Sequence, residues 1–450
     1  EFLRDVLSQP ALLIGIMSCV GLIALKRPFH KVMTGTLKPI LGYLMLAAGA
    51  GVIVSNLDPL GKMIEHGFHI TGVVPNNEAI VAVAQKVLGV ETMSILVVGL
   101  LMNLCIARFT KFKYVFLTGH HSLFMACLMS AVLGTAGLSG MELILVGGFL
   151  MGAWSAISPA IGQSYTSKVT DGDEIAIGHF GSLGYYLSAW VAQYVGKAED
   201  STEDIEIPEK WGFLRDSTLS TALTMIVFYL IAAIAAGSEF VSTLSGDMSP
   251  YLYAVMSAMN FAVGVTIVYS GVRMILGDLI PAFQGIATKI IPNAIPAVDC
   301  AVFFTYAPTA VVLGFLSSFI GGIIGMLILG AVGGVLIIPG LVPHFFCGAT
   351  AGIYGNATGG RRGAAVGAFL NGLAITFLPA MALPVLGQLG FQNTTFGDAD
   401  FAVMGLVLGN AYEWVGMAGI YGIVAIAALV LIIPNFIKTK GKVINYVEEE

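Results

Sequence analysis

Charged residues are scarce in this chain: Asp, Glu, Lys and Arg together make up 11% of its 450 residues, whereas apolar residues make up 57%. Soluble domains carry about 25% charged residues. The shortage of charge therefore excludes an ordinary soluble protein and leaves little room for soluble tails or extra domains. The composition is that of a polytopic membrane protein.

Cysteines and signature motifs are also sparse. The five cysteines stand singly in apolar stretches, with no CxxC pair and no Cys/His spacing of a metal site, so neither a disulfide framework nor a zinc site is predicted. No P-loop, H-E-x-x-H motif or serine nucleophile elbow occurs. The basic residues form no patch of the kind that binds nucleic acid. We therefore expect no metal, no cofactor, no catalytic residue and no nucleic-acid partner.

Long apolar runs are what the chain has in abundance. A run of about 17 to 25 apolar residues can cross the hydrocarbon core as a helix. The candidates are 10–25, 39–57, 89–107, 114–134, 138–157, 219–237, 251–272, 300–318, 320–339, 363–383 and 416–435. Residues 158–195 and 384–412 are interrupted by Pro, Gly, Gln and acidic residues, which favours re-entrant hairpins covered by protein. The predicted fold class is an all-α polytopic membrane protein with about 11 transmembrane helices and two re-entrant hairpins.

The basic residues orient these helices, because cytoplasmic loops are enriched in Lys and Arg. If the N-terminus is outside and the C-terminus inside, seventeen of the 21 Lys and Arg residues fall on the cytoplasmic side. They are Lys26, Arg27, Lys31, Lys38, Arg108, Lys111, Lys113, Lys197, Lys210, Arg215, Arg273, Lys289, Arg361, Arg362, Lys438, Lys440 and Lys442. We predict this orientation, with residues 436–450 as a cytoplasmic tail.

The chain repeats itself at a spacing of 222 to 225 residues. The matching pairs are 159–173 with 384–398, 49–64 with 271–286, and 117–127 with 341–351. Five predicted helices in the first unit turn the second copy over. We therefore interpret 10–195 and 219–412 as inverted repeats within one transmembrane domain, 1–435. Such repeats are typical of transporters, which bind substrate near the midplane between the copies.

An ionisable side chain inside the membrane is costly, so it usually faces a cavity or a partner. His120 begins a helical run, follows a Thr-Gly pair that predicts a helix break, and shares a helix face with Phe124. His121 points elsewhere, and its position favours a structural role over a ligand-binding one. We keep both imidazoles as candidates.

Four further residues draw attention. His179 lies between glycines in the first predicted hairpin, which favours a cavity-facing side chain. Asp299 stands where a helix resumes after Pro292 and Pro296, either as a helix cap or as an acceptor for substrate hydroxyls. Asn77 and Glu78 precede a predicted helix, and an N-terminal cap explains them from sequence alone.

Five stretches together carry a resemblance to a known family. They are TGHHSLFMAC (118–127), SPAIGQ (158–163), VTDGDEIAIGHFG (169–181), STEDIEIPEKWGFLRDS (201–217) and IPAVDCAVFFTYAP (295–308). With them the chain resembles, over nearly its whole length, the ascorbate-specific permease (EIIC) family of the bacterial phosphotransferase system.

The resemblance implies a homodimer in the bacterial cytoplasmic (inner) membrane, in contact with membrane lipid. Each subunit would divide into a V-shaped dimerisation domain and a substrate-binding core that moves in an elevator-like cycle. The substrate would be L-ascorbate. A separate cytosolic EIIB component would phosphorylate it from a phosphocysteine of its own, which EIIA recharges, so the permease would have no phosphorylated residue.

The resemblance also implies a substrate pocket. Its positions here are Asn77, Glu78, His120, Phe124, His179, Phe180 and Asp299. The family pattern has a Thr-Tyr pair where this chain has Asn77 and Glu78, and Gln where it has Phe124 and Phe180. Half of the polar groups of the pocket therefore differ.

Two alternative functions can be compared with the residues alone. An ion-coupled secondary transporter of a small sugar acid or polyol would use Asp299 and Glu142 as proton or sodium sites. An intramembrane enzyme would need a catalytic pair in one cavity, and no pair in the sequence has a diagnostic spacing. A requirement for phosphoenolpyruvate, as opposed to an ion gradient, separates the permease from the secondary transporter.

Overall fold

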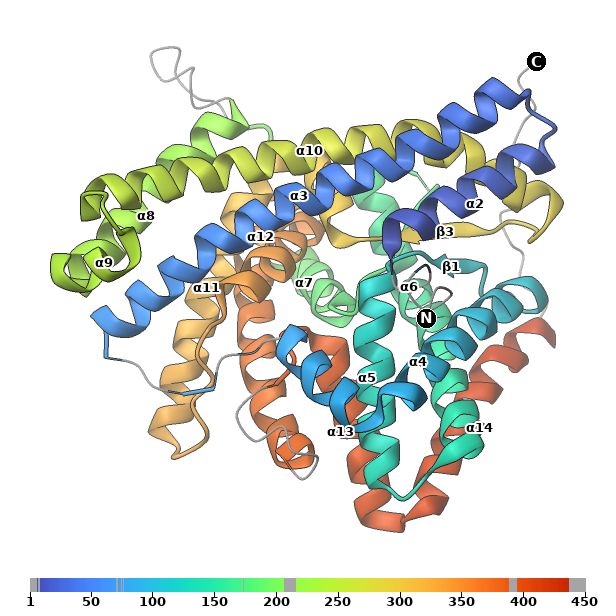
Figure 1. Cartoon of the computed structure of the whole chain (residues 1–450). Helices are drawn as coiled ribbons and strands as arrows, with labels where there is room; N and C mark the ends of the chain where they lie inside the picture. The colour runs from blue at the N-terminus through green and yellow to red at the C-terminus, as the bar shows by residue number, and fades with distance from the viewer. Residues whose placement is uncertain are drawn as a thin grey trace.

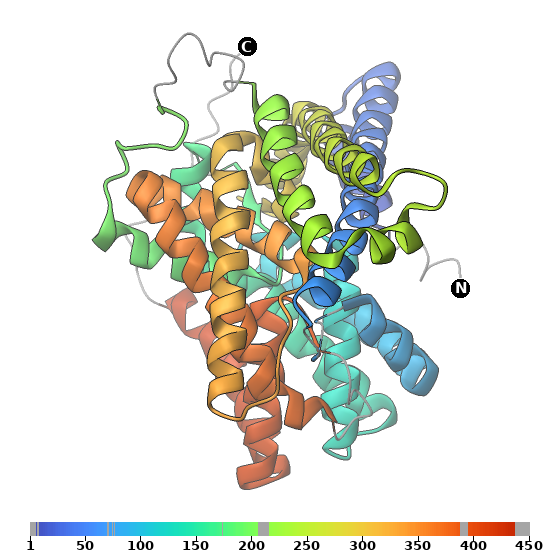
Figure 2. The ribbon, with the colours of Figure 1, turned by 90° about the vertical axis from the view of Figure 1, so that its left-hand side faces the viewer.

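The structure, a computed structural model, describes residues 6, 9–69, 72–73, 75, 77–172, 174–205, 216–387 and 395–436. The predicted tail 436–450 lies outside the described residues apart from Phe436. The described chain is mostly helical, and its helices form two layers, one across the top of Figure 1 and one below it, as the side view of Figure 2 also shows.

One layer is built on two long helices, α3 (Phe29–Gly67) and α10 (Pro250–Lys289), which lie side by side. Helix α2 (Pro10–Ala24) packs on both at one end, and α8 (Ser217–Ala236) and α9 (Ser238–Ser245) pack on both at the other. We call these five helices the α3–α10 layer.

Glycines allow α3 and α10 to approach closely. A Cβ on Gly42 would lie 2.9 Å from the carbonyl oxygen of Gly271, and a Cβ on Gly49 would lie 2.7 Å from that of Gly264. The contacts advance along α3 while they recede along α10, so the helices run antiparallel. The spacing of the predicted repeat separates Gly42 from Gly264 and also separates Gly49 from Gly271. The contacts cross between these two pairs, because Gly42 meets Gly271 and Gly49 meets Gly264. The inverted repeat itself stays a prediction.

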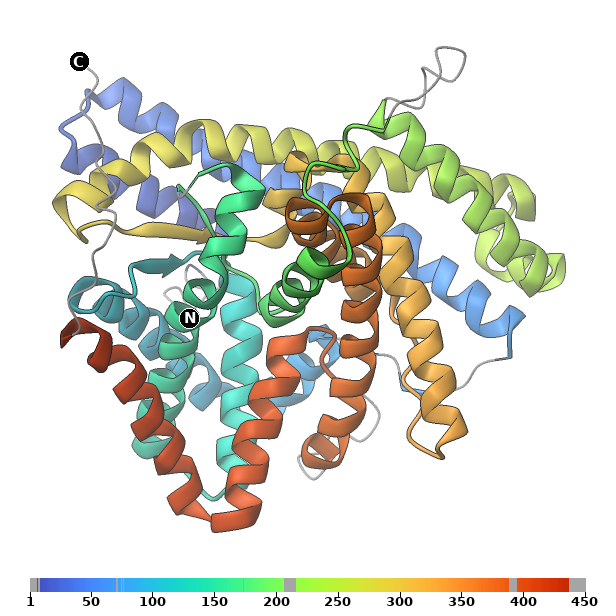
Figure 3. The ribbon, with the colours of Figure 1, turned by 180° about the vertical axis from the view of Figure 1, so that it is seen from behind.

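The second layer holds the other helices. They are α4 (Asn77–Phe109), α5 (Gly119–Thr135), α6 (Gly140–Thr170), α7 (Ser182–Val195), α11 (Pro308–Ala331), α12 (Leu341–Gly387), α13 (Ala399–Val415) and α14 (Met417–Ile432), with the 3-10 turn η3 (Ile433–Phe436) after it. Helices α7 and α11 pack on α12, and α4 packs on α5 and α6. In Figure 3, α13 and α14 meet at an angle at the lower edge, in orange and red.

Among the described residues, seven helices are long and apolar enough to cross a membrane, or eight if the pair α8–α9, bent by 116°, is one span. The count of about 11 transmembrane helices stays a prediction. The structure corrects one part of it, because the predicted spans 300–318 and 320–339 are not separate helices. A 3-10 helix, η2 (Cys300–Tyr306), is followed by the single helix α11, which begins at Pro308 because proline is tolerated in a first helical turn.

Two interrupted segments also have more regular structure than predicted. Helix α6 continues through Pro159 to Thr170, so the first predicted hairpin consists of its last turns, a short connection and α7. In the second predicted hairpin, 384–412, α12 ends at Gly387 and α13 begins at Ala399, while 388–394 lie outside the described residues. Helix α12 itself begins at Leu341, upstream of the predicted span, and bends where Gly359 and Gly360 leave the helical conformation.

The described residues also form a small parallel sheet that the all-α prediction lacks. Strands β1 (Tyr114–Phe116), β2 (Ala176–Ile177) and β3 (Ile295–Val298) lie in the order β1-β3-β2. Val115 pairs with Pro296, and Ile177 pairs with Val298. The central strand comes from the second half of the chain and both outer strands come from the first.

Amide side chains cover both edges of this sheet. Asn103 of α4, 2% exposed, donates to the Tyr114 carbonyl at 3.1 Å and accepts the Phe116 N–H at 3.0 Å. Gln163 of α6 donates to the Ile175 carbonyl at 3.1 Å. Free backbone groups at a strand edge are unfavourable in an apolar interior. These amides explain how so small a sheet is stable among helices.

We expect the glycine contacts between α3 and α10 to control stability. In Gly271→Ala the new Cβ would lie 2.6 Å from backbone atoms of Gly42 and Leu46, so the helices must separate, which costs about 1–3 kcal/mol. In the control Gly277→Ala, on the same helix, the Cβ meets no atom within 4 Å. The temperature at which half the detergent-solubilised protein stays monodisperse should fall for Gly271→Ala only. An equal fall in both variants would contradict the close contact.

Candidate functional site

The carboxyl ends of the three strands bring separate parts of the chain to one place. Strand β1 is followed by Thr118 and the start of α5, β2 by residues 178–181 and the start of α7, and β3 by Asp299 and η2. In parallel sheets, ligands bind beyond the carboxyl ends of the strands. The first N–H groups of a helix have no partner within it and carry partial positive charge. This edge therefore combines backbone donors with polar side chains.

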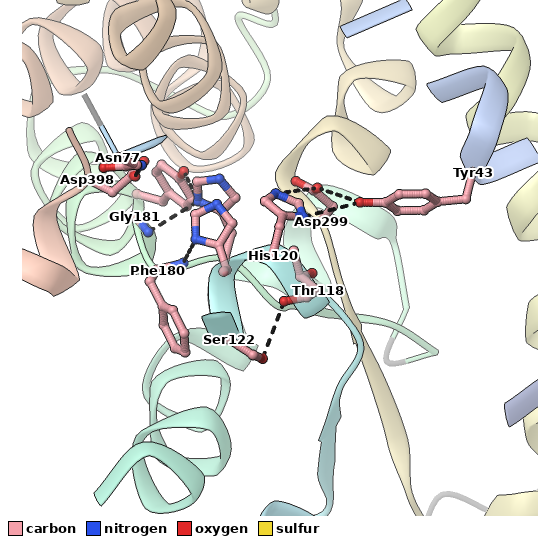
Figure 4. A network of polar contacts seen from close by, with 12 residues as sticks. Tyr43, Asn77, Thr118, His120, Ser122, Phe180, Gly181, Asp299 and Asp398 are labelled. Atoms are coloured by element: carbon pink, nitrogen blue, oxygen red, sulfur yellow. Dashed lines mark hydrogen bonds and ion pairs between the residues drawn. The ribbon is translucent and has the colours of Figure 1, made fainter. Parts of the chain in front are cut away.

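His120 and Asp299 meet at this edge. His120 Nε2 lies 3.6 Å from Asp299 Oδ2. The hydroxyl of Tyr43, which belongs to α3, lies 3.4 Å from both Asp299 Oδ2 and His120 Nδ1 (Figure 4). His120 is the open member of the group, with 37% of its side chain exposed against 10% for Asp299. A ligand can therefore reach the pair from the His120 side.

The imidazoles of His121 and His179 are buried, and their ring centroids lie 3.8 Å apart. Nδ1 of His121 accepts the Phe180 N–H at 3.3 Å. Nδ1 of His179 accepts the Gly181 N–H at 3.2 Å and lies 2.8 Å from the Tyr185 hydroxyl. A neutral imidazole that accepts at Nδ1 carries its proton on Nε2, where it can donate. His121 thus supports the loop that carries His179.

Asp398 lies beside His179, away from Tyr43. Its Oδ1 accepts the thiol of Cys347 at 2.7 Å, and its Oδ2 accepts the side-chain amide of Asn77 at 2.6 Å. Asn77 also accepts the Gly397 N–H at 2.9 Å, so it joins the start of α4 to the chain that leads into α13. In Figure 4, Asn77 and Asp398 lie on the opposite side of the site from Tyr43.

Two buried groups have ligand types that metals use. His179, Cys347 and Asp398 offer atoms within 4.8 Å of one another, and so do His179, Asp299 and Cys300. In the first group, the thiol donates to the carboxylate and the imidazole contacts Tyr185. These hydrogen bonds explain why the side chains of the first group lie together. We therefore assign that group a hydrogen-bonding role and not a metal-binding one.

Aromatic rings form an apolar wall beside the imidazoles. The ring centroid of Phe124 lies 5.8 Å from that of His120, edge to face. Phe180 is fully buried and stacks on Phe116 at 4.6 Å. Phe401 lies between them, 6.2 Å from Phe124 and 5.6 Å from Phe180. Phe180 therefore presents its backbone to the polar groups, while its side chain belongs to the core.

A fully buried carboxylate holds the loop 178–181 in position. Asp400, in the first turn of α13, accepts the Ser182 hydroxyl at 2.8 Å, the Leu183 N–H at 2.9 Å and the Trp154 indole N–H at 3.2 Å. Its own N–H donates to the Phe180 carbonyl at 2.9 Å. Asp400 thus fixes the start of α7 against α6 and α13, immediately after His179.

The structure gathers most of the residues that the sequence singled out. It brings together His120, His121, Phe124, His179 and Asp299, with the Phe180 backbone among them and Asn77 at the margin. Glu78 is the second residue of α4, but its side chain lies outside the described part of the chain.

Four contributors to the site escaped the sequence analysis. They are Tyr43, Tyr185, Cys347 and Asp398. Asp398 had a signal, because it is the last residue of the repeat segment 384–398. Tyr43 and Cys347 lie in apolar runs with nothing in the pattern to distinguish them, and only the packing of α3 and α12 brings them here.

The arrangement suits a small polyhydroxylated anion. Imidazole N–H groups can donate to an anionic oxygen, the partial positive charge at helix starts favours an anion, and Asp299 can accept from hydroxyls. The carboxylate would repel an anion at close range, so it must face the hydroxyl end of such a ligand. The apolar wall limits the space on the remaining side.

Comparisons with known proteins agree with this chemistry. Residues 5–400 match the family described as PTS system sugar-specific permease component. The ascorbate-specific PTS system EIIC component of Mycoplasma pneumoniae is 26% identical over an alignment that covers 92% of this chain and 70% of that protein. With the long apolar helices, the family match indicates a multi-pass membrane protein.

We expect the contacts of Asp400 to control the loop that carries His179. Asp400→Ala leaves one buried and two part-buried donors without their acceptor, at up to about 1–3 kcal/mol for each unsatisfied group. The matched variant Trp154→Phe removes one donor and keeps most of the ring. Thermal unfolding in detergent should therefore occur at a much lower temperature for Asp400→Ala than for Trp154→Phe. Equal losses would show that the carboxylate does not act as a shared acceptor.

Proposed function

The chain belongs to the family of PTS system sugar-specific permease components, and on this premise we propose that it binds L-ascorbate and moves it inward across the bacterial cytoplasmic membrane. A separate cytosolic EIIB component phosphorylates the substrate from its phosphocysteine, which EIIA recharges. The relative from Mycoplasma pneumoniae, an ascorbate-specific EIIC component, supports this choice of substrate.

The observation that carries the proposal is the convergence of His120, His179 and Asp299 beyond the carboxyl ends of three strands. Ascorbate is a small monoanion at neutral pH with several hydroxyls. Its enolate oxygen suits the imidazole and helix-start donors, and its side-chain hydroxyls suit the Asp299 carboxylate. Because Phe124 lies edge to face with His120, we place the ring face of the substrate on this apolar side, where it needs no polar contacts.

The two layers suggest how substrate could move. We assign the α3–α10 layer to the V-shaped dimerisation domain and the second layer, which holds most of the site, to the substrate-binding core. Movement of the core along the first layer would carry His120, His179 and Asp299 from one side of the membrane to the other. A homodimer surrounded by lipid would hold the first layer still during this elevator-like movement.

The proposed orientation places the N-terminus outside and the C-terminus inside. Segments that the charge pattern assigns to the cytoplasm do lie together: the Lys111 N–H donates to the Asn435 side chain, and the Arg361 N–H donates to the Asp200 carbonyl. The loop around Asp200 is held further by Glu203, which accepts from the first N–H groups of α11. We place the docking of EIIB on this face, which the proposed orientation makes cytoplasmic.

Uptake of labelled ascorbate tests the proposed function. In cells that lack their own ascorbate permease but contain the B and A components, expression of this chain should restore accumulation of labelled ascorbate phosphate. Accumulation should require phosphoenolpyruvate and persist when the ion gradients are collapsed. Uptake that needs an ion gradient but no phosphoenolpyruvate would instead favour the ion-coupled transporter.

Substitutions in the site test the proposed binding mode. Purified His120→Ala and Asp299→Asn should each bind ascorbate at least roughly tenfold more weakly, because each loses a charge-assisted hydrogen bond worth about 1.5–3 kcal/mol. His30→Ala, at an exposed imidazole at the start of α3, is the matched control and should bind normally. Isothermal calorimetry gives the dissociation constants. Normal binding by both site variants would show that the site lies elsewhere.

A further inference from the structure

Tyr43 differs from the other members of the site in the element that carries it. His120, His179 and Asp299 follow the strands at the sheet edge, whereas Tyr43 belongs to α3 in the other layer. The preceding residue, Gly42, packs against the backbone of Gly271, so the position of Tyr43 is fixed by the α3–α10 crossing. Figure 4 shows the phenol reaching from α3 to His120 and Asp299.

The Tyr43 hydroxyl occupies hydrogen-bonding capacity that a ligand would need. It donates to Asp299 Oδ2 at 3.4 Å and lies 3.4 Å from His120 Nδ1. The same carboxylate oxygen lies 3.6 Å from His120 Nε2. A substrate hydroxyl that donates to this oxygen would compete with the phenol for it.

Burial makes this competition matter. Tyr43 is 6% exposed and Asp299 is 8% exposed, so water reaches their contact poorly. A buried carboxylate that loses a donor must find another. When Tyr43 leaves, a ligand hydroxyl is the natural replacement, and it can approach through the exposed side of His120.

We propose that Tyr43 reports occupancy of the site to the α3–α10 layer. In the empty site the Tyr43 hydroxyl holds Asp299 and His120 to α3. A bound substrate donates to Asp299 in its place, which breaks this link between the layers and frees the second layer to move. The inference rests on the proposed function for the identity of the ligand, but the Tyr43 contact itself does not depend on it.

The variant Tyr43→Phe separates this role from simple packing. Phenylalanine keeps the ring that fills the space and removes only the competing hydroxyl. Tyr229→Phe is the matched control: Tyr229 is also buried, and its hydroxyl donates to the Asn56 carbonyl, which joins α8 to α3 within one layer. Thermal unfolding checks that both variants are folded.

Two measurements decide the proposal. Because the competitor is gone, Tyr43→Phe should bind ascorbate about three- to tenfold more tightly than the wild type, as expected for the loss of one competing hydrogen bond. Without any ligand, its buried Cys300, the neighbour of Asp299, should react about three- to tenfold faster with N-ethylmaleimide, measured by peptide mass spectrometry. Tyr229→Phe should match the wild type in both.

The outcomes distinguish this proposal from the proposed function. Weaker or unchanged ascorbate binding by Tyr43→Phe would overturn the competition, and unchanged Cys300 labelling would overturn the link between the layers. If the wild type itself binds no ascorbate, the proposed substrate is wrong. The ligand-free labelling of Cys300 then still decides whether Tyr43 holds the site to α3.

Discussion

A polar group in an apolar interior needs a hydrogen-bond partner, and the site of this protein depends on how that need is met. The chain is non-helical at three places, before α5, α7 and η2, and its backbone groups there would otherwise be exposed to hydrocarbon. Pairing of the strands satisfies most of them, and the amides of Asn103 and Gln163 cover the sheet edges. Asp400 takes up the donors at the start of α7. The protein can therefore keep irregular backbone deep inside a helical molecule, where helix starts and side chains are available to a ligand.

The same need for hydrogen-bond partners explains why the site is made from both halves of the chain. The sheet cannot form from the first half alone, because β3 lies between β1 and β2. The α3–α10 layer has a comparable construction, with each half supplying one long helix and the glycines of each meeting the backbone of the other. Strand pairing in one layer and glycine contacts in the other thus join the two halves, in addition to helix packing such as that of α7 on α12.

Sequence reasoning found those site residues whose chemistry is unusual for their surroundings. His120, His179 and Asp299 stand out because imidazoles and a carboxylate are rare in apolar runs. Tyr43 and Cys347 do not stand out, because phenol and thiol groups are ordinary in such runs and only tertiary packing gives them a role. Asp398 is intermediate between the residues that the sequence indicates and those that it does not. The repeat drew attention to its position, but its partners Cys347 and Asn77 come from distant elements.

The fold was predictable to a similar degree. Long apolar runs correctly indicated a helical membrane protein, while the strands, of two to four residues, are too short for a periodic pattern to reveal. The run 300–339 was divided by expected length alone. The structure divides it by backbone chemistry, with η2 before Pro308 and a single helix after it.

The position of β3 in the middle of the sheet has a consequence for biosynthesis. A ribosome adds about 5–20 residues each second, so residues 295–298 follow residues 114–116 by on the order of ten seconds or more. During that interval β1 and β2 have been made, but the strand that pairs with both has not. A nascent chain at this stage holds unpaired backbone amides beside a half-built bundle, and the insertion machinery or lipid headgroups must shelter them until the second half arrives.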